Sequence, residues 1–175
     1  MSSQAASPDT RDLDLETHVT DDHHQAVKLW LRLLSCTNKI ETAIRRRLRE
    51  RFDTSLARFD LMAQLERCPE GLKMNELSQR MMVTGSNVTG LTDQLESKGL
   101  VVRETAAGDR RTFLVRLTPE GRKLFSAMAR EHETWVIELL GGLGATEKDR
   151  IYRLLASLKE QVSLVERTSG AGGQR

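Results

Sequence analysis

The sequence has few cysteines, no long apolar run and little net charge, and each shortage excludes a class of protein. Two cysteines in 175 residues, Cys36 and Cys68, cannot form the disulfide framework of a small secreted domain, so we expect a reducing cytoplasm. No apolar run approaches the roughly 18 residues of a membrane-spanning helix. The first residues lack the apolar segment of a secretory signal. The net charge is only +2, so any binding to nucleic acid must depend on local basic clusters.

The residue patterns of enzymes and metal proteins are also missing. The chain has no glycine-rich phosphate loop and no plausible pairing of a nucleophile with a base. The histidines include one adjacent pair, His23 and His24, which would point apart on a helix. No cysteine lies at a close ligand spacing from them. We therefore expect no catalytic residue, no metal and no cofactor.

The chain is 38% hydrophobic and 30% charged, and helical periodicity is the main pattern in its sequence. Apolar residues recur every three or four positions along most of the chain, which predicts amphipathic helices. A period of two replaces this pattern near 100–103 and 112–117, which predicts a β-hairpin with its turn at 106–109. The helices are expected at 22–51, 56–67, 75–81, 84–98, 118–140 and 146–166.

Capping residues mark where several of these helices begin and end. Thr84 is predicted to be the N-cap of the helix at 84–98, and Gly99 to close it. Thr118, followed by a proline, is predicted to cap the helix at 118–140. Thr146 with Asp149 resembles the capping box of the last helix.

The helix at 84–98 has an outer face of small residues. Val88, Leu91 and Leu95 share one side at helical spacing, as a buried side does. The other side carries small polar groups and a glycine, so the helix can enter a narrow space such as the major groove of DNA. An ordinary solvated face is the alternative. The residues predicted to face the groove or its edge are Thr84, Ser86, Asn87, Thr89, Gly90, Thr92 and Asp93.

The predicted hairpin carries the positive charge that this helix lacks. Arg110 and Arg111 follow Asp109 at its turn, and Arg103 lies on its first strand. A narrow minor groove concentrates negative potential and accepts an arginine, so the turn is a second candidate DNA contact. A solvated turn with a weak surface ion pair is the alternative.

These two motifs, in this order and spacing, resemble the MarR family of bacterial regulators. The segment NELSQRMMVTGSNVTGLTDQLESKGLVVRE resembles the helix-turn-helix of the family, and GDRRTFLVRLTPEG resembles its wing. The resemblance implies that Arg111 enters the minor groove while Asp109 holds its guanidinium. The family often has a glycine where this chain has Met82. A methionine disfavours positive φ, so we expect a different backbone form in that turn.

The resemblance implies a mainly α fold, in which a winged helix-turn-helix with a two-stranded β-wing adjoins long N- and C-terminal helices that form a dimerisation domain. The function it implies is that of a ligand-responsive repressor, which binds a palindromic double-stranded operator as a homodimer. The implied segments are a disordered arm (1–21), an N-terminal dimerisation helix (22–52), the DNA-binding domain (53–117), C-terminal dimerisation helices (118–166) and a disordered tail (167–175).

The densest cluster of charged residues is the run at 45–51, RRRLRER. It is either a solvated helix face or an anion site for DNA phosphate or a phosphate-bearing effector.

The segments LWLRLLSCTNKIE and ARFDLMAQLER are similar to a MarR subgroup associated with aromatic-acid catabolism, which implies an aromatic acid or its CoA thioester, such as hydroxycinnamoyl-CoA, as effector. Ordinary core packing or a solvated face is the alternative for every candidate ligand residue. The candidates are Trp30, Leu34, Arg45, Arg46, Arg49, Phe52, Phe59 and Met62.

Two other functions stay open. One is a winged-helix module that binds only protein, against which the arginines of the hairpin turn argue. The other is a thiol-based redox-sensing repressor that uses Cys36. Peroxide-sensing relatives place a reactive cysteine near the start of the first helix, supported by tyrosines. Here Cys36 lies mid-helix on the apolar side, and Tyr152 is the one tyrosine in the chain. The residues therefore favour a buried structural thiol.

Overall fold

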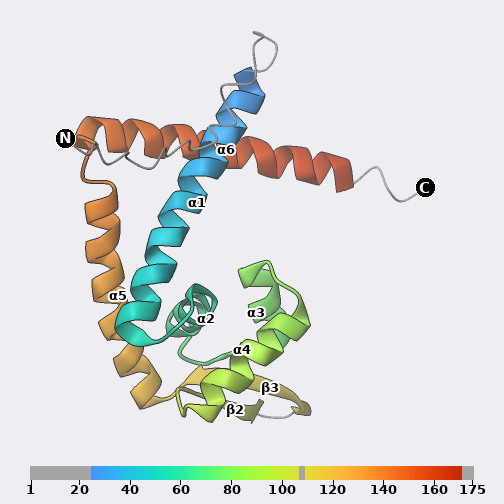
Figure 1. Cartoon of the computed structure of the whole chain (residues 1–175). Helices are drawn as coiled ribbons and strands as arrows, with labels where there is room; N and C mark the ends of the chain where they lie inside the picture. The colour runs from blue at the N-terminus through green and yellow to red at the C-terminus, as the bar shows by residue number, and fades with distance from the viewer. Residues whose placement is uncertain (1–24, 107–108, 171–175) are drawn as a thin grey trace, which may run out of the picture. The chain divides into compact units, whose positions relative to one another are not determined.

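The computed structural model describes residues 25–106 and 109–170, and only the backbone at 106, 109–112 and 169–170 (Figure 1). The predicted arm at 1–21 and the end of the predicted tail lie outside the described residues. The mainly α winged-helix fold is confirmed. Its elements are α1 (Gln25–Phe52), α2 (Leu56–Glu66), β1 (Leu72–Lys73), α3 (Met74–Met81), α4 (Gly85–Ser97), β2 (Val101–Ala106), β3 (Asp109–Leu117), α5 (Pro119–Leu139) and α6 (Ala145–Gly170).

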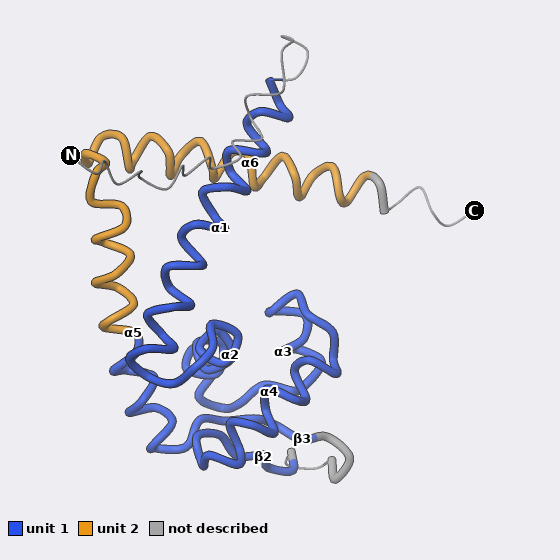
Figure 2. Tube along the Cα trace, viewed as in Figure 1, with its two compact units in different colours: residues 1–128 blue, residues 129–175 orange. Residues whose placement is uncertain are grey.

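The chain divides into two compact units at Met128, inside α5 (Figure 2). The first unit holds α1 to α4, the sheet and the start of α5. Its apolar core draws on every one of these elements, so the helix-turn-helix is fixed to the sheet and to α1 by shared packing. Buried members of this core include Leu48, Leu61, Met62, Leu65, Leu77, Val88, Leu95, Val115 and Met128.

The sheet has three strands in the order β1-β3-β2, so the prediction of a two-stranded wing is incomplete. β1 pairs antiparallel with β3, with Leu72 opposite Val115. Two residues are too short to show an alternating pattern, which is why the sequence did not reveal this strand. Gly71 permits the close approach: its φ is 92°, and an added Cβ would lie 2.7 Å from Arg116 Cγ.

Two predicted caps fix the geometry between α4 and α5. Gly99 has a φ of 69°, and the bonds from Gly99 N to Glu96 O (2.8 Å) and from Leu100 N to Leu95 O (2.9 Å) form a Schellman motif. Thr118 Oγ1 accepts from Gly121 N at 3.0 Å, so Thr118 caps α5 as predicted.

The turn between α3 and α4 contradicts the expectation about Met82. Its φ is 53° and its side chain is 92% exposed, so the methionine adopts the left-handed form that glycine would otherwise supply. Val83 N bonds to Ser78 O at 3.2 Å and Met82 N to Gln79 O at 3.2 Å. These bonds satisfy the last carbonyls of α3 and hold the residue in its strained conformation.

The last helix differs from its prediction at both ends. The side chain that accepts at its start is Glu147, whose Oε2 takes the Gly144 N–H at 2.7 Å, and not Asp149, which pairs with Arg153. The helix continues to Gly170, whereas the sequence predicted a disordered tail from 167. The apolar pattern of this helix ends at Val165. No glycine or proline interrupts the chain between Val165 and Gly170, so backbone bonding continues past the end of the pattern.

Within the described ranges, no helix is long and apolar enough to cross a membrane.

Candidate nucleic-acid interface

α4 buries one side and exposes the other, as its sequence predicts. Val88 and Leu95 are buried in the core, and the opposite side carries small polar groups. An added Cβ at Gly90 would meet nothing within 4 Å, so no contact within the chain requires a glycine there. We call the exposed side the polar face of α4; its members are Ser86, Asn87, Thr89, Gly90, Asp93, Gln94 and Ser97.

Thr92 does not belong to this face, and its prediction as a groove contact is wrong. The residue is fully buried, and its Oγ1 donates to Val88 O at 2.7 Å within the helix. It lies one residue from Leu91 on the packed side, where a β-branched threonine fits once its hydroxyl bonds the preceding turn.

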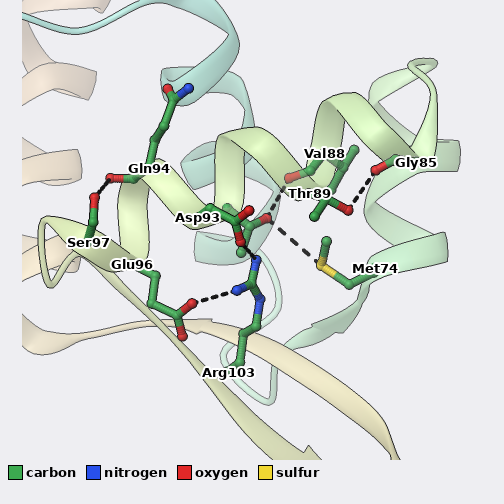
Figure 3. Close-up of polar contacts among 10 residues, drawn as sticks. Met74, Gly85, Val88, Thr89, Asp93, Gln94, Glu96, Ser97 and Arg103 are labelled. Carbon is green, nitrogen blue, oxygen red and sulfur yellow. Dashed lines mark hydrogen bonds and ion pairs between the residues drawn. The ribbon is translucent and has the colours of Figure 1, made fainter.

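Thr84 occupies the N-cap position by backbone, with a φ of −68° and a ψ of 151°, but its side chain makes no capping bond. Its hydroxyl instead lies 3.1 Å from that of Ser86. Thr89 Oγ1 donates to Gly85 O at 2.9 Å (Figure 3), so it retains its lone pairs as acceptors for a partner outside the chain.

Arg103 joins the wing to α4. Its Nη1 donates to Glu96 Oε2 at 2.6 Å and its Nη2 to Asp93, so one guanidinium of β2 holds two carboxylates of the helix (Figure 3). Its side chain is 24% exposed. The sequence placed Arg103 among the DNA contacts, whereas the structure gives it a different task. It fixes the wing strand against α4 and neutralises Asp93 on the polar face and Glu96 beside it.

A second arginine lies at this surface and was not predicted from the sequence. Arg58 of α2 donates from Nε (2.9 Å) and Nη2 (2.6 Å) to Oε1 of Gln94 on the polar face. Ser55, the N-cap of α2, accepts from the backbone N–H of Arg58 at 3.3 Å. Arg58 and Gln94 are far apart in the chain, so no local pattern links them. The available signal was the place of Gln94 on the polar side of the helical pattern, in line with Gly90 and Ser97.

The hairpin forms where it was predicted. β2 and β3 pair antiparallel from Val101 opposite Leu117 to Ala106 opposite Asp109, with an irregularity at Thr105 and Ala106. β3 starts with Asp109, Arg110 and Arg111, for which the structure describes only the backbone. Arg116, further along β3, donates to Glu104 at 2.7 Å and to Pro69 O at 3.1 Å. These bonds hold it at the base of the wing.

Comparisons with known proteins agree with this geometry. A sequence profile of the MarR family matches residues 52–112. An uncharacterized HTH-type transcriptional regulator of Bacillus subtilis, YdgJ, is 30% identical over 112 residues, 64% of this chain and 68% of that protein. The crystal structure of a MarR family transcriptional regulator from Silicibacter pomeroyi is 31% identical and covers 82% of this chain and 99% of its own, with a TM-score of 0.70.

The chain belongs to the MarR family. Its relatives are transcriptional regulators and not enzymes. Two less similar structures share its fold. One is a mutant of MarR from E. coli complexed with operator DNA (24% identity, 79% of this chain and 99% of that one, TM-score 0.69). The other is CouR from Rhodococcus jostii RHA1 bound to p-coumaroyl-CoA (23% identity, 74% and 90%, TM-score 0.65).

The candidate ligand residues of this MarR-family protein do not form one site in a single chain. Phe59 and Met62 are buried in the core, and Phe59 stacks on Phe125 with ring centroids 5.5 Å apart. Trp30 and Leu34 are instead exposed on α1, at 59% and 38%. Phe52 is partly buried at the end of the same helix.

The candidate basic residues of α1 are exposed. Arg45 pairs with Glu41 at 2.5 Å, as the solvated-face alternative expects, and Arg49 is exposed. Arg46 lines a shallow hollow of about 340 Å³ together with Lys39 and Thr42. An anion could enter this hollow, but the contacts within the chain do not require one.

Cys36 is exposed in the single chain, so the prediction of a buried thiol is wrong for one protomer. The apolar side of α1 is uncovered around it, as the exposure of Trp30 and Leu34 also shows. Among the residues with described side chains, no group of three His, Cys, Asp or Glu is placed to hold a metal ion.

Proposed function

We propose that this MarR-family protein is a repressor that binds a palindromic operator as a homodimer. The observation that carries the proposal is the polar face of α4, which is free of long charged side chains and flanked by the wing. In this proposal α4 enters the major groove, and Arg110 and Arg111 of the wing reach the adjacent minor groove. The shared fold of the E. coli MarR mutant, which was crystallised with operator DNA, supports the assignment. Such binding would place the protein in the cytoplasm with the chromosome.

The homodimer is supported by apolar surface that one chain leaves exposed. α6 carries five apolar residues on one stripe, each between 39% and 52% exposed. A contiguous apolar stripe of this length marks an interaction surface. A two-fold partner would cover it and would align two copies of α4 with two half-sites. The stripe consists of Ile151, Leu155, Leu158, Val162 and Val165.

We further propose that an aromatic acid or its CoA thioester releases the protein from DNA. The exposed basic residues Arg45, Arg46 and Arg49 could bind the phosphates of CoA, and CouR, with the same fold, was crystallised with p-coumaroyl-CoA. Isothermal titration with CoA thioesters and with their free acids tests this. We expect heat of binding for the thioester; equal or absent heats would contradict the proposal.

The DNA-binding proposal is tested by fluorescence anisotropy with duplex DNA from upstream of the protein's own gene. Binding through phosphate contacts releases counterions, so the affinity should fall steeply between low and high salt. A scrambled duplex of the same length is the control for non-specific binding. A module that binds only protein would leave the anisotropy unchanged at every salt concentration.

A further inference from the structure

The pair formed by Arg58 and Gln94 has a chemical consequence for base recognition. Arg58 extends from α2 to the polar face of α4, where its guanidinium donates two hydrogen bonds to one oxygen, Gln94 Oε1. A guanidinium carries only donors, so the carboxamide must turn its oxygen toward Arg58 and its NH₂ group away. The orientation of the amide is thus fixed by the neighbouring helix.

This fixed orientation changes what Gln94 can recognise. A free glutamine in the major groove usually pairs with adenine, accepting from N6 and donating to N7. With Oε1 occupied by Arg58, Gln94 offers donors alone, and the remaining N–H groups of Arg58 are donors too. In the major groove cytosine presents an amino donor, adenine presents an amino donor beside its N7 acceptor, and thymine presents one acceptor, O4. Guanine alone presents two adjacent acceptors, O6 and N7, so a group with donors alone matches guanine best.

The position of the pair suits such contact. Gln94 is exposed one helical turn after Gly90, where the polar face carries no side chain. In the close-up, the side chain of Gln94 extends away from Arg103 (Figure 3). Because Arg58 bonds to the end of the Gln94 side chain, the two arginines act on different flanks of α4. Arg103 compensates acidic groups on its flank, and Arg58 adds positive charge on the other.

We propose that Arg58 and Gln94 act together as a donor-only unit that selects guanine at one position of each operator half-site. The inference rests on the proposed function, because it assumes that the polar face of α4 enters the major groove. Gln94 is the specificity-determining residue, and Arg58 is a positioning residue that removes its acceptor.

The test is selection of binding sites from random duplexes by the full-length chain and its variants. The wild type should select guanine at one position per half-site. Arg58→Leu frees Oε1, so the same position should shift toward adenine while the rest of the motif is kept. Gln94→Ala should lose the guanine preference there by about 5- to 100-fold, the discrimination of one good base contact.

Two further variants control for misfolding and for the general loss of an arginine. Gln94→Glu keeps an oxygen for Arg58 but has no amide donor, so it should fold normally and lose the guanine preference. Arg122→Leu removes another partly exposed arginine, one that pairs with Glu66 at 3.2 Å, and should leave the motif unchanged. Circular dichroism checks the folding of each variant.

The outcomes separate the inference from the function. If the wild type selects a symmetric motif and Arg58→Leu selects the same bases, the inference is wrong and the DNA-binding function stands. The same holds if the wild-type motif has no guanine that responds to Gln94→Ala. If the wild type enriches no motif, the proposed function fails and the inference fails with it.

Discussion

Replacing two residues of the apolar stripe on α6 by aspartate should split the proposed homodimer. Leu155 and Leu158 are 43% and 39% exposed in the single chain, and a two-fold partner would cover them. The double variant Leu155→Asp/Leu158→Asp removes the apolar area and places two carboxylates in the same contact.

The magnitude follows from the exposure of the two leucines. Fully burying a leucine stabilises by about 1.5–3 kcal/mol, so covering about two-fifths of each side chain contributes about 1 kcal/mol. Symmetry repeats each loss in the second chain, which gives about 4 kcal/mol for the double variant before the cost of the carboxylates is counted. Unpaired buried carboxylates add to this. We therefore expect the dimer dissociation constant to rise by at least about a thousandfold.

Sedimentation velocity over a wide concentration range measures this change. The wild type should sediment as two chains and the double variant as one, with helical content by circular dichroism retained. Ala156→Asp is the matched control, because it adds an aspartate on the far side of the same helix and should leave the dimer intact. If the double variant still sediments as two chains, the stripe on α6 does not hold the dimer together.

Other substitutions test the remaining parts of the account. Thr92→Val should leave operator affinity unchanged and change the free energy of unfolding by no more than about 1 kcal/mol, because the hydroxyl bonds only within the core; weakened DNA binding would return Thr92 to the interface. Met82→Gly should raise the free energy of unfolding by about 0.5–1 kcal/mol in denaturant titration, since it relieves a left-handed methionine at some cost in chain entropy; a loss of stability would speak against the strained turn. Gly121→Ala should cost about 3 kcal/mol, because the new Cβ would lie 1.9 Å from Leu100 O, and a neutral result would mean that α5 and the sheet adjust freely. Arg111→Ala should weaken operator binding by about 5- to 100-fold in gel-shift titration without changing helicity or the dimer, and unchanged binding would remove Arg111 from the interface.

The sequence was sufficient for the elements that repeat an apolar pattern over many turns. The long helices α1 and α5 and the Gly99 and Thr118 caps all lie where periodicity and capping chemistry place them. β1 was missed because two residues carry no period. Met82 was misjudged because a local preference of about 1–2 kcal/mol can be overcome by the hydrogen bonds that close a helix.

The candidate site was predictable as a surface but not as a set of contacts. Periodicity separates the packed and polar sides of α4, yet Thr92 shows that a small polar residue can lie on the packed side. The roles of Arg103 and Arg58 depend on carboxylates and an amide brought close by folding, Arg58 on a residue of another helix. Such partners are set by tertiary packing, so a single sequence reveals the arginines without revealing what they hold.

In the proposed function, two copies of α4 and the wing bind one duplex symmetrically. Hydroxyl-radical footprinting of the full-length chain on its selected duplex tests this most directly. Symmetric binding should give two protected patches related by a two-fold axis, on one face of the duplex and about one helical turn of roughly 10 base pairs apart. A single unsymmetrical patch, or no protection, would contradict it.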